Sequence, residues 1–410
     1  MRILIATSHG SLVGGVEKYL QTLIPGMRNR GHEIGLIHEN PAGGTGETID
    51  PPPPSLASWC LAELGPEATL RIVAEWKPDV VYSHGLQDAG FEQSLLAGYP
   101  SALYAHNYFG TCPTGQKCHS LPSPRPCSRR SGPMCLVLHY PRRCGGLNPF
   151  TMWRMYQRNA QLQGRLQDYE AILVASRHMF REYERQGVNS SKLHFVPLPT
   201  GDGSPQPDPP AAHAPRNRIL LVGRLTRLKG GSHLIHAIPK AAAKLGRPLT
   251  LAVAGDGPER GRLESLANRL GVRATFAGWV DDERRREMMR QADLLAVPSV
   301  WPEPFGLVGV EAGALGLPAV GYAVGGIPEW LIPGHSGELA PGDPPTVDGL
   351  ADAIVRAVAD PAHYAKLCRG AWETSGASTL RAHLERLEPI LEGARRRGTA
   401  SPCLAGPRAV

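Results

Sequence analysis

The sequence predicts an α/β protein of two tandem domains, each built around a parallel β-sheet. Short apolar runs of strand length alternate with longer amphipathic stretches from the first residues onward, which is the pattern of βαβ units. A stretch rich in proline and glycine, 197–218, interrupts the alternation, which then restarts. The length of 410 residues also suits two domains of the usual size, ~100–200 residues each.

The strand candidates can be placed in order along both halves. Those of the first half lie at 2–6, 33–38, 79–84, 101–106, 171–176 and 193–197, and helices are expected between them, for example at 16–31 and 68–77. Those of the second half lie at 218–223, 249–255, 273–278, 293–298 and 318–322, with a helix expected at 258–271. A long helical region, 346–396, closes the pattern.

These elements predict the domain boundaries. The N-terminal Rossmann-like domain spans 1–198 and carries a cysteine-rich insert at 107–146. A proline-rich linker, 199–217, leads to a C-terminal Rossmann-like domain at 218–394, and a tail, 395–410, is expected to be disordered. Ligands of open α/β sheets bind beyond the carboxyl ends of the strands, so we expect a deep cleft where the two domains face each other.

The composition limits the kinds of partner that the protein is expected to bind. The formal net charge of +7 and the pI of about 9.0 favour anionic partners such as nucleotides or lipid headgroups. Scattered basic residues and the lack of a recognisable motif argue against nucleic acid. No secretory signal and no apolar run long enough to cross a bilayer is visible, which indicates a cytoplasmic protein with a peripheral contact on the inner membrane face.

Three loops after predicted strands could contact a ligand, and the first two suit a phosphate. Gly14 and Gly15 open the first predicted helix, where a backbone without side chains lets a phosphate approach the helix N-terminus. Arg224 and Lys229 follow the first strand of the second half and could neutralise a diphosphate, although a solvated basic loop is the simpler alternative. Asp256 could bind a ligand or, as we prefer, cap the following helix.

The most specific stretch is "WPEPFGLVGVEAGALGLPAVGYAVGGIPEW", 301–330, which places two glutamates eight positions apart. A helix is expected to begin near Phe305 or Gly306, with Glu303 just before it and Glu311 more than one turn inside. The amides of Phe305, Gly306 and Leu307 would then be donors without intrahelical partners. Carboxylates accept hydrogen bonds from paired hydroxyls, so one glutamate could hold a sugar and the other a ribose; a helix-dipole partner and a solvated residue are the alternatives.

Taken together, these motifs resemble the signature of the family 4 retaining glycosyltransferases, also called glycosyl transferases group 1, which have the GT-B fold. The E-x7-E spacing matches, as do "GGIPE" (325–329), "VGRLTRLKG" (222–230), "AGDGP" (254–258) and "GGVEKY" (14–19). The resemblance covers residues 1 to 390. It implies transfer of a sugar from a nucleotide-diphosphate sugar to a saccharide, lipid-linked or other hydroxyl acceptor in cell-envelope or exopolysaccharide synthesis.

The resemblance also assigns roles. Arg224 and Lys229 would clamp the donor diphosphate, Glu311 would bind the donor ribose, and Glu303 would hold the donor sugar together with the amides that follow it. Gly15 would approach the phosphates from the other domain. His106 matches the family histidine near the anomeric carbon, with a strand-end structural histidine as the alternative, and Asn107 stands where the family usually has aspartate.

The implied reaction proceeds with net retention and needs no catalytic metal. The leaving phosphate would help deprotonate the acceptor, and the positive clamp would stabilise the charge that develops on the diphosphate. The residues that would carry the catalysis are His106, Glu303, Arg224 and Lys229.

The cysteine-rich insert is a separate feature beside His106. Five cysteines lie between 112 and 144, and three states remain open for them: a structural zinc site, disulfides or free thiols. The spacings lack a C-x2-C knuckle, which weakens the zinc alternative. The five residues are Cys112, Cys118, Cys127, Cys135 and Cys144.

Two other function classes compete. A glycoside hydrolase would use a glutamate pair on opposite sides of the scissile bond, but this leaves Arg224 and Lys229 unexplained. A non-catalytic nucleotide-binding protein explains the basic pI and the phosphate loops, but not Glu303 and His106 directed at one cleft.

Overall fold

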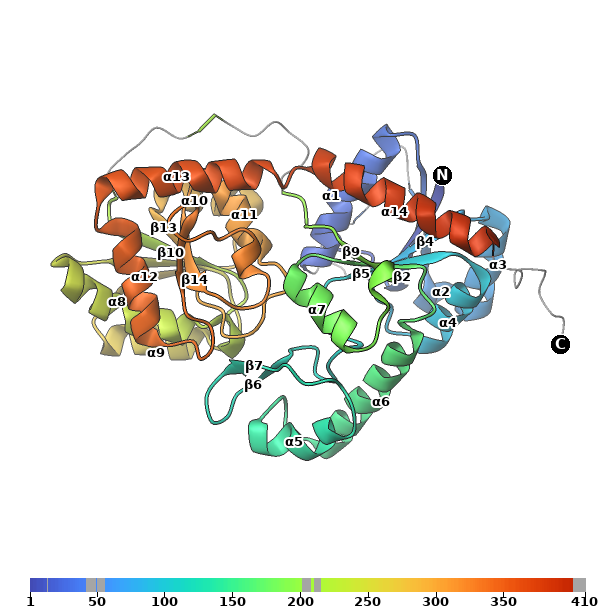
Figure 1. Ribbon diagram of the computed structural model, residues 1–410, viewed down its shortest axis with the longest axis horizontal. Coiled ribbons are helices and arrows are strands. Elements are labelled where there is room, and N and C mark those ends of the chain that lie inside the picture. Colours follow the sequence, from blue (N-terminus) through green and yellow to red (C-terminus); the bar gives the residue numbers. More distant parts are fainter. Residues whose placement is uncertain (13, 42–48, 50–55, 201–207, 210–214, 401–410) are drawn as a thin grey trace.

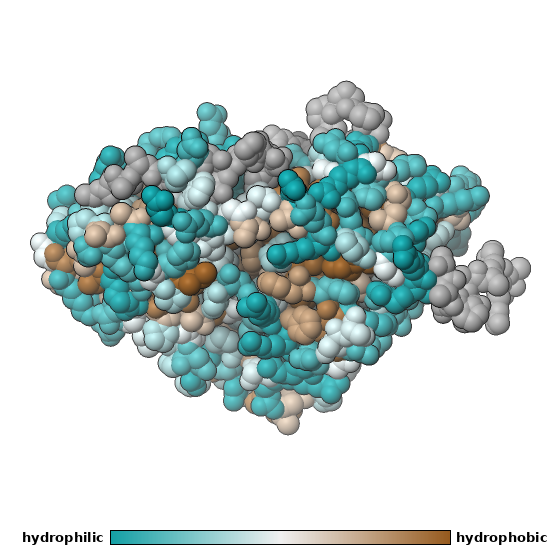
Figure 2. All heavy atoms as spheres, turned by 45° about the horizontal axis from the view of Figure 1, so that its top comes forward, coloured by the Kyte–Doolittle hydropathy of each residue, from teal (hydrophilic) through white to brown (hydrophobic). Residues whose placement is uncertain are grey.

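The computed structural model of the protein describes residues 1–12, 14–41, 49, 56–200, 208–209 and 215–400. It forms two halves side by side, each with helices packed around its own parallel sheet (Figure 1). The predicted fold class is therefore confirmed. Figure 2 shows that hydrophilic residues cover most of the visible face and that hydrophobic ones gather near the middle of the view.

The N-terminal sheet has seven parallel strands in the order β3-β2-β1-β4-β5-β8-β9. These strands are β1 (Arg2–His9), β2 (Glu33–Asn40), β3 (Ala57–Cys60), β4 (Val80–Ser83), β5 (Ser101–Ala105), β8 (Ala171–Val174) and β9 (Leu193–Phe195). Its helices are α1 (Gly15–Asn29), α2 (Leu61–Leu64), α3 (Pro66–Trp76), α4 (Ala89–Gly98), α6 (Pro149–Arg165) and α7 (Arg177–Arg185), with a short η1 (Ser190–Lys192). All six strands predicted for this half are present, and β3 is additional.

The central strand β1 shows why this half folds as it does. Ile3, Leu4 and Ile5 are all fully buried, because helices cover both faces of a parallel sheet and leave no solvent-facing side. Burial of each such side chain contributes ~1.5–3 kcal/mol. The continuous apolar run therefore specifies a central strand rather than an edge strand.

The C-terminal sheet has six parallel strands in the order β12-β11-β10-β13-β14-β15. These strands are β10 (Arg218–Val222), β11 (Thr250–Ala254), β12 (Arg273–Gly278), β13 (Leu294–Val297), β14 (Ala319–Tyr322) and β15 (Gly337–Ala340). The helices between them are α8 (Gly231–Leu245), α9 (Arg260–Arg269), α10 (Asp282–Gln291) and α11 (Leu307–Gly313), with short turns η2 (Arg227–Lys229) and η3 (Ile327–Glu329). The five strands predicted here are confirmed, and β15 was not predicted.

The closing helical region differs from the expectation in two ways. It consists of three helices, α12 (Val347–Val358), α13 (Pro361–Gly376) and α14 (Leu380–Ala400). The last one leaves the C-terminal half and packs on α1, β4 and β5 of the N-terminal half (Figure 1). The prediction that the chain is disordered from residue 395 onward is wrong as far as Ala400, because α14 continues to that residue. The helix is held in place by its apolar face, including Leu387 and Leu391, which is buried against that sheet. Most of the predicted linker and residues 401–410 lie outside the described residues.

The cysteine-rich insert folds as a small unit of its own. It contains a short antiparallel hairpin, β6 (Cys118–His119) and β7 (Arg125–Pro126), and the helix α5 (Met134–Arg142), which packs on α6. Lys117 is buried in its centre, where its Nζ contacts Glu182 at 2.9 Å and donates to the carbonyl oxygens of Thr111 and Arg129. This buried, fully hydrogen-bonded cation ties the insert to α7.

Among the described residues, no helix is both long enough and apolar enough to cross a membrane.

Candidate functional site

The two halves enclose a cleft of about 1310 Å³. Its walls come from the carboxyl ends of β5, β10 and β13, the start of α1, and the loops before α10 and α11. All of the predicted catalytic and donor-binding residues except Asp256 line it, namely Gly14, Gly15, His106, Arg224, Lys229, Glu303, Phe305, Gly306, Leu307 and Glu311. The predicted cleft is thus present at the strand ends where open α/β sheets bind ligands.

Lys229 and Glu303 form an ion pair in this cleft. The Lys229 Nζ lies 2.6 Å from Glu303 Oε1, which also accepts from Ser299 Oγ at 2.6 Å and from Trp301 Nε1 at 3.0 Å. Glu303 is 5% exposed, whereas Lys229 keeps more than a third of its side-chain surface accessible. The lysine can therefore meet a ligand while the carboxylate fixes its position.

The charge on Glu303 is secured by its surroundings. Burial raises the pKa of the carboxyl, but the Lys229 ammonium and the hydrogen bonds from Ser299 and Trp301 outweigh burial, so that the pKa lies below its ordinary value. Glu303 is consequently ionised at neutral pH and cannot act as a proton donor there.

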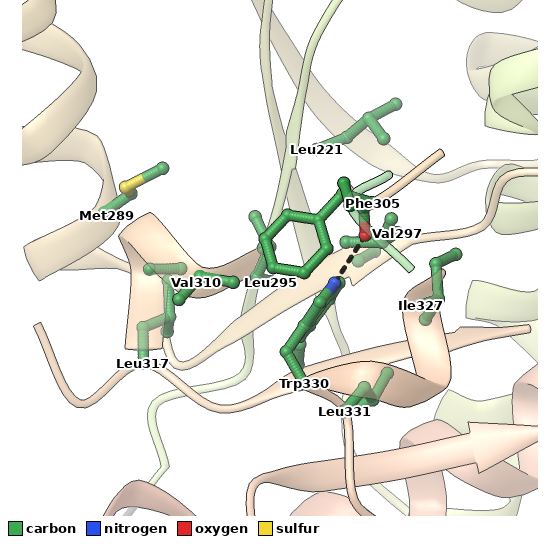
Figure 3. Close-up of a cluster of buried hydrophobic side chains, with 14 of the residues drawn as sticks. Leu221, Met289, Leu295, Val297, Phe305, Val310, Leu317, Ile327, Trp330 and Leu331 are labelled. Carbon is green, nitrogen blue, oxygen red and sulfur yellow. Dashed lines mark hydrogen bonds between the residues drawn. The ribbon is translucent and has the colours of Figure 1, made fainter. Parts of the chain in front are cut away.

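The loop that carries Glu303 is held in place by contacts with the segment 325–330. Trp330 Nε1 donates to the carbonyl oxygen of Phe305 at 2.7 Å, and both rings pack in the apolar cluster beneath α11 (Figure 3). The amide of Gly326 donates to the carbonyl oxygen of Glu303 at 2.7 Å. Gly325 adopts φ +57°, and a Cβ on it would lie 2.2 Å from that same oxygen. The "GGIPE" motif is thus a support for the Glu303 loop.

Helix α11 begins at Leu307, one residue after the predicted start near Phe305 or Gly306, with Gly306 in the left-handed conformation at its N-cap. The first amides of a helix have no intrahelical acceptor. They border the cleft together with Pro304 and Val308. This end of α11 can therefore donate to an electronegative ligand.

Arg224 and Glu311 lie on the same side of the cleft. Glu311 is paired with Arg285 of α10, with Nη2 to Oε1 at 3.4 Å, and its side chain is 18% exposed. The pair is long and partly accessible, so Glu311 retains acceptor capacity for hydroxyl groups. The alternative that Glu311 is simply solvated is not what the structure shows.

The N-terminal half contributes the opposite wall. Gly14 and Gly15 stand at the start of α1, and a Cβ added to Gly15 would meet open space. At the rim, Lys18 of α1 pairs with Asp282 of α10 at 2.6 Å. The two halves are thus linked across the cleft by an ion pair that solvent partly screens.

His106 belongs to a cluster of aromatic rings at the end of the N-terminal sheet. Its Nε2 lies 2.8 Å from Nδ1 of His84, and the Tyr19 ring packs against it edge-on. Burial, and then the nearby His383, lower the pKa of His106 to about 3; burial also lowers the pKa of His383 to about 4. His106 borders both the main cleft and a second, smaller pocket of about 60 Å³ in the N-terminal half.

This cluster predicts a loss of stability in mild acid. A histidine whose pKa is lower in the folded than in the unfolded state favours unfolding as the pH falls below the unfolded value of ~6.5, with a slope of up to ~1.4 kcal/mol per pH unit for each histidine. The window therefore runs from pH ~6.5 down to the folded pKa, which is about 4 for His383 and about 3 for His106. Urea unfolding between pH 7.5 and 5 should show that the free energy of unfolding declines. His383→Leu should make this decline less steep, whereas His236→Gln, at an exposed position, should leave it unchanged. A free energy of unfolding that does not vary with pH would contradict the prediction.

The structure does not bring Asp256 to the cleft. Its carboxylate is exposed and accepts from Gly257 N at 2.7 Å and from Arg260 Nη1 at 2.8 Å. Helix α9 begins at Arg260 with Glu259 at its N-cap, so the preferred capping role is wrong. The reason is that Gly257 has a φ of +155°, outside the helical range, and that the backbone on either side of it bonds to Leu225, through Asp256 O and Glu259 N.

The cysteines of the insert are free thiols in this structure. Burial, with a smaller contribution from neighbouring thiols of the insert, raises the pKa of Cys118 to about 12 and that of Cys144 to about 11. Within the described residues, no three histidine, cysteine, aspartate or glutamate side chains are placed so that they could hold a metal ion. The zinc site stays a prediction, which metal analysis of the purified protein tests.

Sequence reasoning missed several partners of the site. Ser299 and Trp301 stand four and two positions before Glu303, close enough to have suggested its hydrogen bonds. His84 ends "DVVYSH" as His106 ends "SALYAH", and the two parallel strands are neighbours. Lys18 and Arg285 gave no clear signal, because Lys18 reaches Asp282 only where the two halves meet, and Arg285 reaches Glu311 only through the packing of α10 beside α11.

The arrangement suits recognition of an anion that carries hydroxyl groups. Arg224, Lys229 and the start of α11 can neutralise negative charge, and Glu311 can accept from hydroxyls. The neutral His106 faces them from the other half.

Comparisons with known proteins agree with this geometry. Residues 13–200 match the family model "Glycosyltransferase Family 4", and residues 206–373 match "Glycosyl transferases group 1". The glycogen synthase of Mycobacterium tuberculosis is 36% identical over 191 residues, which are 43% of this chain and 45% of that protein. The matches span a third to under half of the length of the first curated relatives.

Solved structures show the same fold over nearly the whole chain. Sucrose-phosphate synthase from Thermosynechococcus elongatus superposes with a TM-score of 0.72 at 21% identity, covering 98% of this chain and all of that one. Anabaena Alr3699/HepE in complex with UDP and glucose superposes with a TM-score of 0.66 at 18% identity, covering 96% and 99% of the two chains. The chain belongs to the family 4 glycosyltransferases and has their GT-B fold.

Proposed function

We propose that this protein is a retaining glycosyltransferase that moves a sugar from a nucleotide-diphosphate sugar to a hydroxyl acceptor. The acceptor is a saccharide or a lipid-linked compound, and the reaction serves cell-envelope or exopolysaccharide synthesis in the cytoplasm, at the inner membrane face. Family membership and neighbours in complex with UDP and UDP-glucose support a nucleotide-sugar donor.

The observation that carries the proposal is the Lys229–Glu303 pair beside the start of α11. A diphosphate between Lys229 and Arg224 would meet two cations, and a sugar attached to it would reach the carboxylate and amides of the Glu303 loop. Cations and hydrogen-bond donors that are already in position stabilise the charge that develops on the leaving phosphate.

The ion pair and hydrogen bonds of Glu303 reduce its nucleophilicity, which favours retention by another route. Its Oε1 is engaged by Lys229, Ser299 and Trp301 at once. Attack by the acceptor on the face that the diphosphate leaves, with a phosphate oxygen taking the acceptor proton, requires no protein nucleophile. The bond to the diphosphate breaks, the new glycosidic bond forms, and the proton ends on the released nucleotide.

A glycoside hydrolase is disfavoured by the state of the two glutamates. Hydrolysis needs one carboxyl kept protonated by a raised pKa. The pKa of Glu303 is instead lowered, and Glu311 is paired with Arg285. Glu303 is therefore not in the state that a general acid requires, and Glu311 is bound to a cation.

A donor screen tests the proposal. Purified protein is incubated with UDP-, GDP- and ADP-sugars, and released nucleotide is measured beside Glu303→Ala and Lys229→Ala, with the partly exposed Glu264→Ala on α9, outside the cleft, as a control. Release from one donor that both site variants lose is the expected result, and proton NMR of the product should show the anomeric configuration of that donor. Nucleotide binding without turnover of any donor or acceptor mixture would indicate the non-catalytic alternative.

Glu311→Ala is expected to raise the KM for that donor by ~10–100-fold and to change kcat less. The reason is that the ribose hydroxyls lose their acceptor equally in the ground state and the transition state. Steady-state kinetics at varied donor concentration check this. An unchanged KM would remove Glu311 from the donor site.

A further inference from the structure

The end of the cysteine-rich insert exposes an unusual set of hydrophobic side chains. Half of the large hydrophobic residues that are exposed in the described part of the chain fall within residues 134–153. Phe150 is 81% exposed, Val137 65% and Leu147 61%. We name this the tip surface; it consists of Met134, Val137 and Tyr140 on α5 and Leu147, Phe150 and Trp153 at the start of α6.

The tip surface projects away from both sheets. Helices α5 and α6 form the lower end of the molecule in Figure 1, on the side opposite α13. The two helices pack against each other, which holds the hydrophobic side chains on one protrusion. An exposed hydrophobic surface of this kind indicates a site that binds another protein or a membrane.

The charge around the tip surface is as uneven as its hydrophobicity. Residues 107–167 contain nine lysines and arginines and no aspartate or glutamate. This excess is larger than the net charge of the whole chain, +7, so the rest of the protein is slightly acidic. Arg143 and Arg154 are exposed beside the hydrophobic residues.

The hydrophobic side chains and the positive charge together distinguish between three possible binding partners: a second copy of the chain, nucleic acid and a lipid bilayer. A second copy bound through this face would place the same basic surface against itself, because a two-fold interface is self-complementary. Nucleic acid would satisfy the arginines but not Val137, Leu147 or Phe150. A bilayer with anionic headgroups meets both demands, since aromatic and aliphatic side chains enter the headgroup boundary while arginines contact phosphates.

We infer that the tip surface is the site by which this protein docks on an anionic lipid bilayer. Phe150 and Leu147 enter the interface, Trp153 and Tyr140 lie at headgroup level, and Arg143 and Arg154 pair with lipid phosphates. The inference rests on the peripheral membrane contact of the proposed function and names the surface that makes it.

The docked tip is connected to the transfer site. Helix α6 continues from Trp153 to Arg158, Leu162 and Arg165, which line the second pocket together with His106. On its other side the insert reaches the C-terminal half, where Arg125 pairs with Asp343 at 2.9 Å. A lipid-linked acceptor that extends from the bilayer along α6 would therefore approach the pocket that His106 shares with the main cleft.

Vesicle sedimentation without any donor tests the inference, so that failure of docking and failure of transfer are separable. The probes are vesicles of phosphatidylcholine alone and of phosphatidylcholine with 30 mol% phosphatidylglycerol. We expect binding to the anionic vesicles only, weakened at 0.5 M salt. Phe150→Ser with Trp153→Ser, and separately Arg143→Glu with Arg154→Glu, should each reduce the bound fraction at least ~10-fold.

Matched controls lie away from the tip. Leu64→Ser replaces an exposed leucine on α2, and Lys366→Glu with Arg369→Glu reverses two exposed charges on α13; both should bind like the wild type. Thermal unfolding confirms that the tip variants are folded. The inference is overturned if the wild type does not bind, if the tip variants bind as tightly as it does, or if they only convert a dimer into a monomer.

Discussion

Glu303→Gln is expected to lower kcat for donor turnover by ~10²–10³-fold, the usual loss when one preorganised electrostatic contact to the transition state is removed. Glutamine keeps the shape of glutamate, and its carbonyl oxygen can still accept from Ser299 and Trp301. It removes the charge that holds the Lys229 ammonium at 2.6 Å. Lysine would then be free to take other rotamers, and the sugar would lose its strongest acceptor.

The same substitution separates a chemical from a structural role. Because Lys229 is partly exposed, its ammonium can be hydrated, and the free energy of unfolding should change by no more than ~1 kcal/mol. Urea unfolding and donor kinetics on one preparation check both expectations. A Glu303→Gln protein with wild-type kcat would remove Glu303 from the catalytic machinery, whatever its stability.

Gly325→Ala is expected to lower the free energy of unfolding by at least ~3 kcal/mol, through the cost of a left-handed backbone and a contact that cannot relax. Gly325 has φ +57°, and its new Cβ would lie 2.2 Å from the carbonyl oxygen of Glu303. That oxygen accepts from the amide of Gly326, so the clash would displace the Glu303 loop itself. Activity should fall with stability.

Gly334→Ala is the matched control for this effect. Gly334 has a similar φ, +69°, but a Cβ on it would have no atom within 4 Å. It should cost only the ~1–2 kcal/mol of the backbone conformation. The difference between the two variants in urea unfolding isolates the close approach to Glu303. Equal losses in both would show that the Glu303 loop can move away from a methyl group at little cost.

The sequence was sufficient for the parts of this site that depend on local patterns. Apolar runs such as Ile3–Ile5 predict buried parallel strands because helices cover both faces, and the E-x7-E spacing places Glu303 and Glu311 correctly about the start of α11. The strands that sequence reasoning overlooked, β3 and β15, are short runs at or near the sheet edges, "ASWC" and "GELA". Such runs lack a clear hydrophobic period.

Contacts between distant segments could not be predicted in the same way. Trp330 supports Phe305, and Lys18 meets Asp282, only because the chain folds back or the two halves meet. Helix α14 has an ordinary amphipathic pattern that does not say which sheet it covers. Asp256 shows the opposite error, because its place in a motif predicted a ligand contact or a helix cap. Its side chain instead bonds to Arg260.

The most direct test of the account is the equilibrium dissociation constant of UDP, GDP and ADP, measured by isothermal titration calorimetry for the wild type and for Lys229→Met. The account predicts that one of these nucleotides binds the wild type at one site per chain. Lys229→Met should bind it ~10–100-fold more weakly, which is the value of a charged hydrogen bond to phosphate. Binding of equal strength to both proteins would contradict the assignment of the Lys229–Glu303 cleft to the donor diphosphate.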